Sequence, residues 1–216
     1  MKPKVRHIIW DFNGTLLRDV ELALSIDNQL LKQMGMEPIT LEEYRTFMRN
    51  PVDLFYRDLG VDLEKHDFAR INEAFLEAFD REVLRAGLMP GALDAICALQ
   101  AAGYTQSILS SSYEPTLQSQ AQDLGLTPYM LAVTGLTDNR GGTKEERGLH
   151  QLASLGVAPE EAVLVGDMIT DAFVASHMGC RCILVEGGHN TRRRLCQCGM
   201  PVAADITKVP SILMEA

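Results

Sequence analysis

The chain has 216 residues, of which 46% are hydrophobic, so it is long enough to bury a sizeable core in one or two domains. Its formal net charge of -9 argues against nucleic acid or an anionic membrane surface as the main partner. No apolar run approaches the ~18 residues of a membrane-spanning helix, and the five cysteines occur without a secretion signal, so we expect a protein of the reducing cytoplasm.

The first predicted element is a strand over residues 5–10, an apolar run of the kind that lies buried on both faces of a parallel sheet. Asp11 follows it directly, and Asn13 and Gly14 come next. On extended backbone the side chains of Asp11 and Asn13 lean the same way, and Gly14 allows a turn and the close approach of a ligand. Because Asp, Asn and Gly also form turns and helix caps, the segment fits either a structural turn or a functional site.

Residues 18–86 contain helical patterns and no convincing strand pattern. Asp19 fits the N-cap of a first helix, a second begins near Thr40 with an acidic first turn, and a short third follows. A fourth, longer helix is indicated by apolar residues at helical spacing, namely Ile71, Phe75, Phe79 and Val83. We therefore expect residues 18–86 to form an all-helical domain inserted into a second domain, which consists of residues 1–17 and 87–216.

After Pro90 and Gly91, helix and strand patterns alternate. The predicted strands cover residues 105–109, 130–133, 162–165 and 182–185. The predicted helices cover residues 92–102 and 114–124, a segment that ends at Leu155, a segment after Asp167, residues 190–198, and a short segment after Lys208. This alternation predicts βαβ units, and therefore an α/β fold with a Rossmann-like, doubly wound parallel sheet and helices on both faces.

Polar residues follow several of the predicted strands, namely Asp11 with Asn13, Ser110, and Asp167 with Asp171. Because ligands bind beyond the carboxyl ends of parallel strands, we expect these residues to share one edge of the sheet. Converging carboxylates repel one another, and a divalent cation relieves the repulsion. A ligand set of oxygens only, without His or Cys nearby, favours Mg²⁺, so the sequence predicts a Mg²⁺ cofactor at this edge.

Such a site suits phosphoryl chemistry. The cation would shield a phosphate from the carboxylates, so that one of them can attack phosphorus. Ser110 can donate a hydrogen bond to a phosphoryl oxygen, and Lys144, after Gly141 and Gly142, places a positive charge at the start of a helix. Each residue also has a structural interpretation: Ser110 as an N-cap, Lys144 as a surface lysine, and Asp171 as an acid of a first helical turn. The occurrence of all these residues in this order favours the functional interpretation.

These motifs resemble those of the haloacid dehalogenase superfamily, most of whose members are phosphatases, and the layout is most similar to phosphoglycolate-phosphatase-like members. Residues 11–16 match the family signature Asp-x-Asp-Gly-Thr-Leu except at Asn13, and residues 166–171 match Gly-Asp-x-x-x-Asp. Ser110 and Lys144 match the family's Ser/Thr and lysine. The resemblance covers essentially the whole chain, and the helical domain resembles the family's smaller mobile cap.

The resemblance implies roles for individual residues. Asp11 would be the nucleophile that forms an aspartyl-phosphate, and Ser110 and Lys144 would bind the phosphoryl group. Mg²⁺ would be held by Asp11, the backbone carbonyl of Asn13, Asp167 and Asp171. Substrate contacts are expected from Gly14, Thr15, Ser111 and, at a break between cap helices, Arg49, for which an exposed position is the alternative. The expected partner is a small phosphorylated metabolite, a phosphoglycolate-like monoester, and the expected assembly is a monomer or homodimer.

Asn13 is the serious departure, because the phosphatases of the family carry there an Asp that acts as general acid and base. An amide forms hydrogen bonds but cannot relay a proton, and the loss of general acid–base catalysis typically costs about 10²–10⁴ in rate. Slow hydrolysis, an activated substrate such as an acyl phosphate, or a proton-transfer group from the cap or the substrate would each be compatible with Asn13. The alternative from another functional class is a non-hydrolytic phosphoryl-binding sensor or interaction protein on the same fold.

Other interpretations fit the sequence less well. Residues 141–144 lack the first glycine of a Walker-type loop, and the first strand-to-helix turn lacks the Gly-x-Gly-x-x-Gly of a Rossmann dehydrogenase. Two Cys-x-Cys pairs, at residues 180–182 and 196–198, are spaced more closely than the cysteines of structural zinc sites. We expect these cysteines to act as small apolar side chains.

Overall fold

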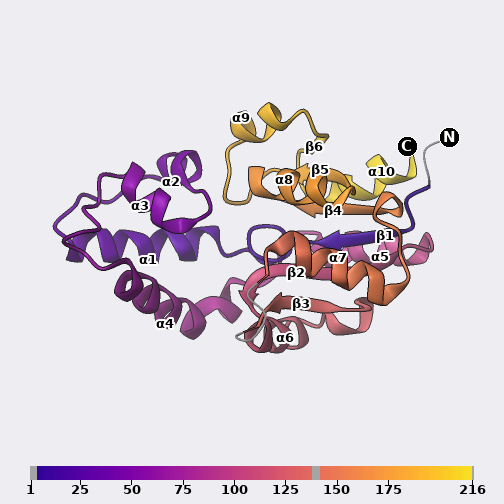
Figure 1. Ribbon diagram of the computed structural model, residues 1–216, viewed down its shortest axis with the longest axis horizontal. Coiled ribbons are helices and arrows are strands. Elements are labelled where there is room, and N and C mark those ends of the chain that lie inside the picture. Colours follow the sequence, from indigo (N-terminus) through magenta and orange to yellow (C-terminus); the bar gives the residue numbers. More distant parts are fainter. Residues whose placement is uncertain (1–3, 138–141, 216) are drawn as a thin grey trace.

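The computed structural model describes residues 4–137 and 142–215, which form an α/β body and a helical body side by side (Figure 1). Gly141, which precedes the predicted helix of Lys144, lies outside the described residues. None of the helices described is both long enough and apolar enough to cross a membrane.

A parallel sheet of six strands forms the centre of the α/β body in the described residues, in the order β3-β2-β1-β4-β5-β6. The strands are β1 (His7–Trp10), β2 (Thr105–Tyr113), β3 (Val133–Leu136), β4 (Ala162–Gly166), β5 (Arg181–Val185) and β6 (Val202–Ala203). Because β1 pairs with β2 on one side and with β4 on the other, its short apolar segment is buried along its whole length. The strand order runs outward in opposite directions from β1 and β4, so the carboxyl ends of these two strands form the switch point of a doubly wound sheet. The predicted fold class is confirmed.

Helices cover both faces of the sheet, because successive side chains of each strand point to opposite faces. Ile8 and Trp10 of β1 lie in one apolar cluster, together with Ile96 of α5, whereas Ile9 lies in a second cluster with Leu152 of α7. The helices of this body are α5 (Ala92–Ala101), α6 (Glu114–Asp123), α7 (Lys144–Leu155), α8 (Ile169–Met178), α9 (Arg192–Leu195) and α10 (Val209–Met214).

The helical body consists of α1 (Val20–Gln33), α2 (Leu41–Phe47), α3 (Val52–Asp58) and α4 (Phe68–Ala86). The chain enters and leaves it at one place, where Leu17 and Leu88 form an antiparallel bridge. Thr40 begins α2 with a capping box, in which its side chain accepts a hydrogen bond from the backbone of Glu43. Asp19 stands at the N-cap position of α1, but its side chain does not cap the helix. The predicted N-cap position of Asp19 is therefore confirmed, but its carboxylate forms hydrogen bonds in the site described below and not with the start of α1.

Three further elements differ from their predictions. β3 lies three residues later than residues 130–133, because Thr127–Tyr129 form a 3-10 turn and delay the strand. β2 continues beyond residue 109 to Tyr113, with a register shift against β3 after Leu109. The helix predicted over residues 190–198 is the shorter α9, followed by a 3-10 turn at Cys196–Cys198.

Candidate active site

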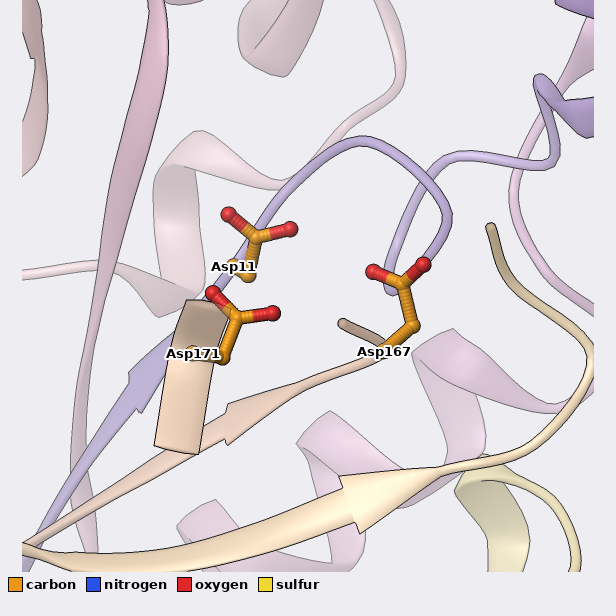
Figure 2. A group of neighbouring side chains, drawn as sticks. All are labelled: Asp11, Asp167 and Asp171. Atoms are coloured by element: carbon orange, nitrogen blue, oxygen red, sulfur yellow. The ribbon is translucent and has the colours of Figure 1, made fainter. Parts of the chain in front are cut away.

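Three acidic side chains meet at the carboxyl ends of β1 and β4. Asp11 follows β1, Asp167 follows β4, and Asp171 lies in the first turn of α8. All three are buried, and one carboxylate oxygen from each lies within 4.8 Å of the others. Figure 2 shows the carboxyl groups of Asp11 and Asp171 beside each other, with that of Asp167 across from them. Because these oxygens are hard donors in close proximity, the cluster can hold a divalent cation.

Lys144, the first residue of α7, reaches into this cluster. Its Nζ donates hydrogen bonds to Asp11 Oδ1 at 2.5 Å and to Asp171 Oδ1 at 2.8 Å. Burial alone would lower the pKa of Lys144, but the carboxylates of Asp11 and Asp171 outweigh burial and raise it. Lys144 therefore carries its positive charge inside the site, and its binding of a phosphoryl group stays a prediction from the sequence.

Two of these carboxyl groups, those of Asp11 and Asp167, have a pKa above the value of an exposed acid. Burial raises the pKa of Asp11 to about 7, although Lys144 acts in the opposite direction. Burial also raises the pKa of Asp167 to about 6, against the positive charge of His189. The positive charges of Lys144 and His189 thus do not offset the effect of burial on the pKa of Asp11 and Asp167. A divalent cation would favour their ionised forms, so the donor set fits such an ion.

Asn13 is fixed in a chain of hydrogen bonds. Its Nδ2 donates to Asp19 Oδ2 at 2.9 Å, and its Oδ1 accepts from Ser112 Oγ at 2.9 Å. Ser110 Oγ in turn donates to Ser112 Oγ at 3.1 Å. The amide is therefore held at both ends by side chains, and Ser112 and Asp19 join the residues that the sequence had placed here.

Gly14 and Thr15 support the acidic side chains. Thr15 Oγ1 donates to Asp167 Oδ1 at 2.8 Å, and the Gly14 amide donates to Asp19 Oδ1 at 2.7 Å. Gly14 has φ +71°, and a Cβ at this position would collide with Asp167 and His189, so only glycine fits here. Neither Gly14 nor Thr15 lines the cavity described below.

His189 is a further residue of this site that the sequence analysis missed. Its backbone N–H donates to Asp167 Oδ2 at 2.6 Å, its Nδ1 bonds the Tyr44 hydroxyl at 2.8 Å, and its Nε2 lies 3.5 Å from Asp19 Oδ2. Burial would lower the pKa of His189, but Asp19 outweighs burial and raises it to about 9. The segment after β5 reaches the same sheet edge as Asp11 and Asp167. The position of His189 shortly after a predicted strand could therefore have indicated that it belongs to this site.

A cavity of about 480 Å³ extends from the acidic cluster to the helical body. Its core wall includes Asp11, Asn13, Ser110, Ser111, Lys144 and Asp171. Its opposite wall comes from α1 to α4 and is largely apolar and aromatic. Arg49 is not among the lining residues and instead pairs with Asp58 at 2.7 Å, so a substrate contact by Arg49 stays a prediction from the sequence.

Two relatives of known name align over nearly the whole chain. A phosphoglycolate phosphatase of Synechococcus elongatus is 27% identical over 214 residues, which cover 97% of this chain and 95% of that protein. A phosphoglycolate phosphatase of Rhodobacter capsulatus is 26% identical over 214 residues, with 95% of each chain covered.

The fold is shared with solved structures. A structure described as a predicted phosphatase from Clostridium acetobutylicum superposes with a TM-score of 0.83 at 17% identity, covering 99% of this chain and 100% of that one. A haloacid dehalogenase-like family protein from Streptococcus pneumoniae superposes with a TM-score of 0.82 at 18% identity, covering 96% and 98%. Residues 8–185 match the sequence pattern of the haloacid dehalogenase-like hydrolases, and since this is well over half of the chain, the protein belongs to that family of hydrolases.

Proposed function

We propose that the chain is a Mg²⁺-dependent phosphatase that hydrolyses small phosphate monoesters through an aspartyl-phosphate on Asp11. The observation that carries the proposal is the buried cluster of Asp11, Asp167 and Asp171, with Lys144 bonded to two of them at the switch point of the sheet. The aligned relatives described as phosphoglycolate phosphatases support this reaction class. We expect the enzyme to act in the cytoplasm on a small phosphorylated metabolite, as a monomer or homodimer.

Asp11 is the proposed nucleophile. One of its carboxylate oxygens forms a bond to phosphorus while the bond between phosphorus and the leaving-group oxygen breaks, and the leaving oxygen takes the electron pair and then a proton from solvent. Water then attacks phosphorus, which releases inorganic phosphate and restores Asp11. Lys144 keeps a positive charge beside the reacting carboxylate, and Ser110 and Ser111, which line the cavity, are placed to donate hydrogen bonds to phosphoryl oxygens.

Asp11, Asp167, Asp171 and the backbone carbonyl of Asn13 are the residues that would hold Mg²⁺. When bound, the ion supplies positive charge that offsets the carboxylates and polarises the phosphoryl group. Thr15 and the His189 backbone N–H both donate hydrogen bonds to Asp167 and so orient its carboxylate toward the proposed ion site.

The second candidate function is phosphoryl binding without turnover, and Asn13 is the observation that favours it. The position two residues after the nucleophile carries an amide that is held by Ser112 and Asp19, and an amide cannot donate a proton to a leaving group. A sensor or interaction protein on this fold would bind phosphate and Mg²⁺ without releasing a product.

Turnover of a panel of aryl and alkyl phosphates, with Mg²⁺ and after its removal by chelation, tests the proposal. We expect turnover that chelation abolishes and added Mg²⁺ restores. Asp11→Asn should abolish turnover and any covalent phosphate while the circular dichroism spectrum is kept. Asp94→Asn, which removes an exposed carboxylate in α5, is the matched control and should keep activity. Activity in purified Asp11→Asn would refute the nucleophile, and phosphate binding without turnover of any ester would favour the sensor.

A further inference from the structure

Asp27 is a buried acid in the wall of the cavity that faces the acidic cluster. It lies in α1, is 2% exposed, and lines the same cavity as Asp11 and Lys144. Its Oδ1 accepts a hydrogen bond of 2.6 Å from the Tyr56 hydroxyl. Its Oδ2 is buried and has no hydrogen-bond partner in the described part of the chain. A buried carboxylate oxygen without a donor is costly, so a group that donates to Oδ2 would be strongly favoured.

The surroundings of Asp27 suit a positively charged group. Aromatic rings of the helical body also line the cavity, namely Tyr44, Tyr56, Phe75 and Phe79, and Tyr56 contacts Asp27 directly. Aromatic faces attract cations, and a carboxylate beside them adds direct charge complementarity. Burial raises the pKa of Asp27 to about 7, against the hydrogen bond from Tyr56, and a bound cation would favour the ionised form.

Among the described lining residues, a negatively charged leaving group would find only cations that already lie beside carboxylates. Lys144 is the one Lys or Arg among the described lining residues, and it already bonds Asp11 and Asp171. His189 also lines the cavity, but its Nε2 faces Asp19 at 3.5 Å. On α2, Arg45 donates to the Gly187 and Gly188 carbonyls instead of reaching the cavity.

We propose that Asp27 Oδ2 selects phosphate monoesters whose leaving group carries an ammonium group, and that it disfavours carboxylate-bearing esters such as phosphoglycolate. The test of this inference by kcat/KM rests on the proposed phosphatase function, whereas its test by equilibrium binding does not depend on turnover. The leaving group would lie with its phosphoryl end at Asp11 and its ammonium end between Asp27 and the aromatic rings.

Three esters with two-carbon leaving groups test the charge alone: ethanolamine phosphate, ethyl phosphate and phosphoglycolate. We expect kcat/KM to fall in that order, with about a tenfold or greater advantage of ethanolamine phosphate over ethyl phosphate, as for a hydrogen bond to a charged group. Equilibrium binding of the three esters to the Asp11→Asn protein should follow the same order. Equal values, or a preference for phosphoglycolate, would overturn the inference.

Asp27→Asn provides the second test, because an amide whose oxygen accepts from Tyr56 turns its N–H₂ toward the cavity. The ratio of kcat/KM for ethanolamine phosphate to that for ethyl phosphate should fall about tenfold, and kcat/KM for phosphoglycolate should rise relative to both. Asp53→Asn is the matched control, since it removes an acid that pairs with Arg57 at 3.6 Å and does not line the cavity, and the ratios should stay as in the parent protein. If these ratios do not change in Asp27→Asn, the inference is wrong. If that variant does not fold, the order of kcat/KM for the three esters in the parent protein decides whether the inference holds.

The outcomes separate this inference from the proposed function. Turnover of all three esters with no preference refutes the role of Asp27 and leaves the phosphatase intact. Absence of turnover for every ester, with tighter and Asp27-dependent binding of ethanolamine phosphate, refutes the phosphatase and supports the ammonium site.

Discussion

Asn13 joins the core wall of the cavity to Asp19, since its Nδ2 donates to Asp19 Oδ2 at 2.9 Å. An acid at position 13 would therefore lie directly beside another carboxyl group. Two carboxyl groups this close share a proton, because their negative charges repel, and the pKa of one is raised. A protonated carboxyl at this position could serve the leaving group as a general acid, which the amide cannot do.

Asn13→Asp should therefore accelerate the hydrolysis of alkyl phosphates about tenfold or more, and that of aryl phosphates much less, because aryl leaving groups need little protonation. The measurement is kcat/KM for ethyl phosphate and p-nitrophenyl phosphate at saturating Mg²⁺. Asn13→Ala, which removes the amide without supplying an acid, is the control and should accelerate neither. An Asn13→Asp protein that binds Mg²⁺ and is no faster on any alkyl ester would defeat this account.

At the scale of single elements, β1 and β2 are joined by a buried histidine. His7 Nδ1 and Nε2 bond the hydroxyls of Thr105 and Ser107, each at 2.8 Å. Burial, with a smaller effect of Arg6, lowers the pKa of His7 from 6.5 to about 4. The unfolded chain therefore binds a proton at His7 at a higher pH than the folded chain does.

The contribution of His7 to stability should be present above pH 6.5 and lost progressively as the pH falls toward 4. Between pH 7 and pH 5 the free energy of unfolding should drop by about 2 kcal/mol from this residue alone. Urea unfolding of the parent protein and of His7→Gln at both pH values measures the effect. The parent should lose more stability than the variant, since all other titrating groups are common to both. Equal losses would show that His7 does not titrate in this range.

The elements that the sequence predicted well are those whose apolar pattern is continuous. β1, β4 and β5 are buried on both faces, and α4 repeats apolar residues on one face, so local patterns were sufficient. β3 was predicted too early, because the apolar residues 130–132 lie between a 3-10 turn and the strand without joining either, and Leu131 is 59% exposed. A short edge strand lacks the burial that would distinguish it from such a turn.

The sequence predicted those residues of the candidate site that lie at or near the ends of strands. Asp11, Ser110, Asp167 and Asp171 follow strands, and the switch-point rule brings them together. His189 also follows a strand, β5, but its contacts with Asp19, Asp167 and Tyr44 depend on tertiary packing and give it its place in the site. Asp27 lies in a helix and could not be found from strand ends, because the lack of a donor to its Oδ2 among the described residues is visible only in the folded chain.

At the scale of the whole molecule, hydrogen bonds connect α2 and its C-cap residue Met48 to the segment after β5. Arg45 donates to the carbonyl oxygens of Gly187 and Gly188 at 2.6 and 2.8 Å. Asn190 and Arg194 donate to the Met48 carbonyl at 2.9 and 2.6 Å. These contacts bring Tyr44 to His189 and so complete the wall of the cavity.

Arg45→Ala should loosen this attachment, because two hydrogen bonds from one guanidinium group are lost. We expect faster amide hydrogen exchange in α2 and a rise in KM for small esters of about threefold or more, since each hydrogen bond contributes about 1 kcal/mol. Arg57→Ala, which breaks an exposed pair with Asp53 inside the helical body, is the control and should leave exchange in α2 unchanged. Unchanged exchange in Arg45→Ala would show that the helical body is held by its other contacts alone.

The central position of β1 has a consequence for how the protein is made. Of the six strands described, β1 is the first to be synthesised. Its partner strands β2 and β4 are made only after the entire helical body, and His7 meets Thr105 across a separation of 98 residues. Helices α1 and α4, which contact each other, are complete before β2 exists. Because domains tend to fold as their residues emerge, helices α1 to α4 can pack while the nascent strand that precedes Asp11 is still unpaired. Asp11 therefore reaches its final surroundings only after most of the chain has been made, and a nascent chain truncated before β2 would carry the helical wall of the cavity without the acidic cluster.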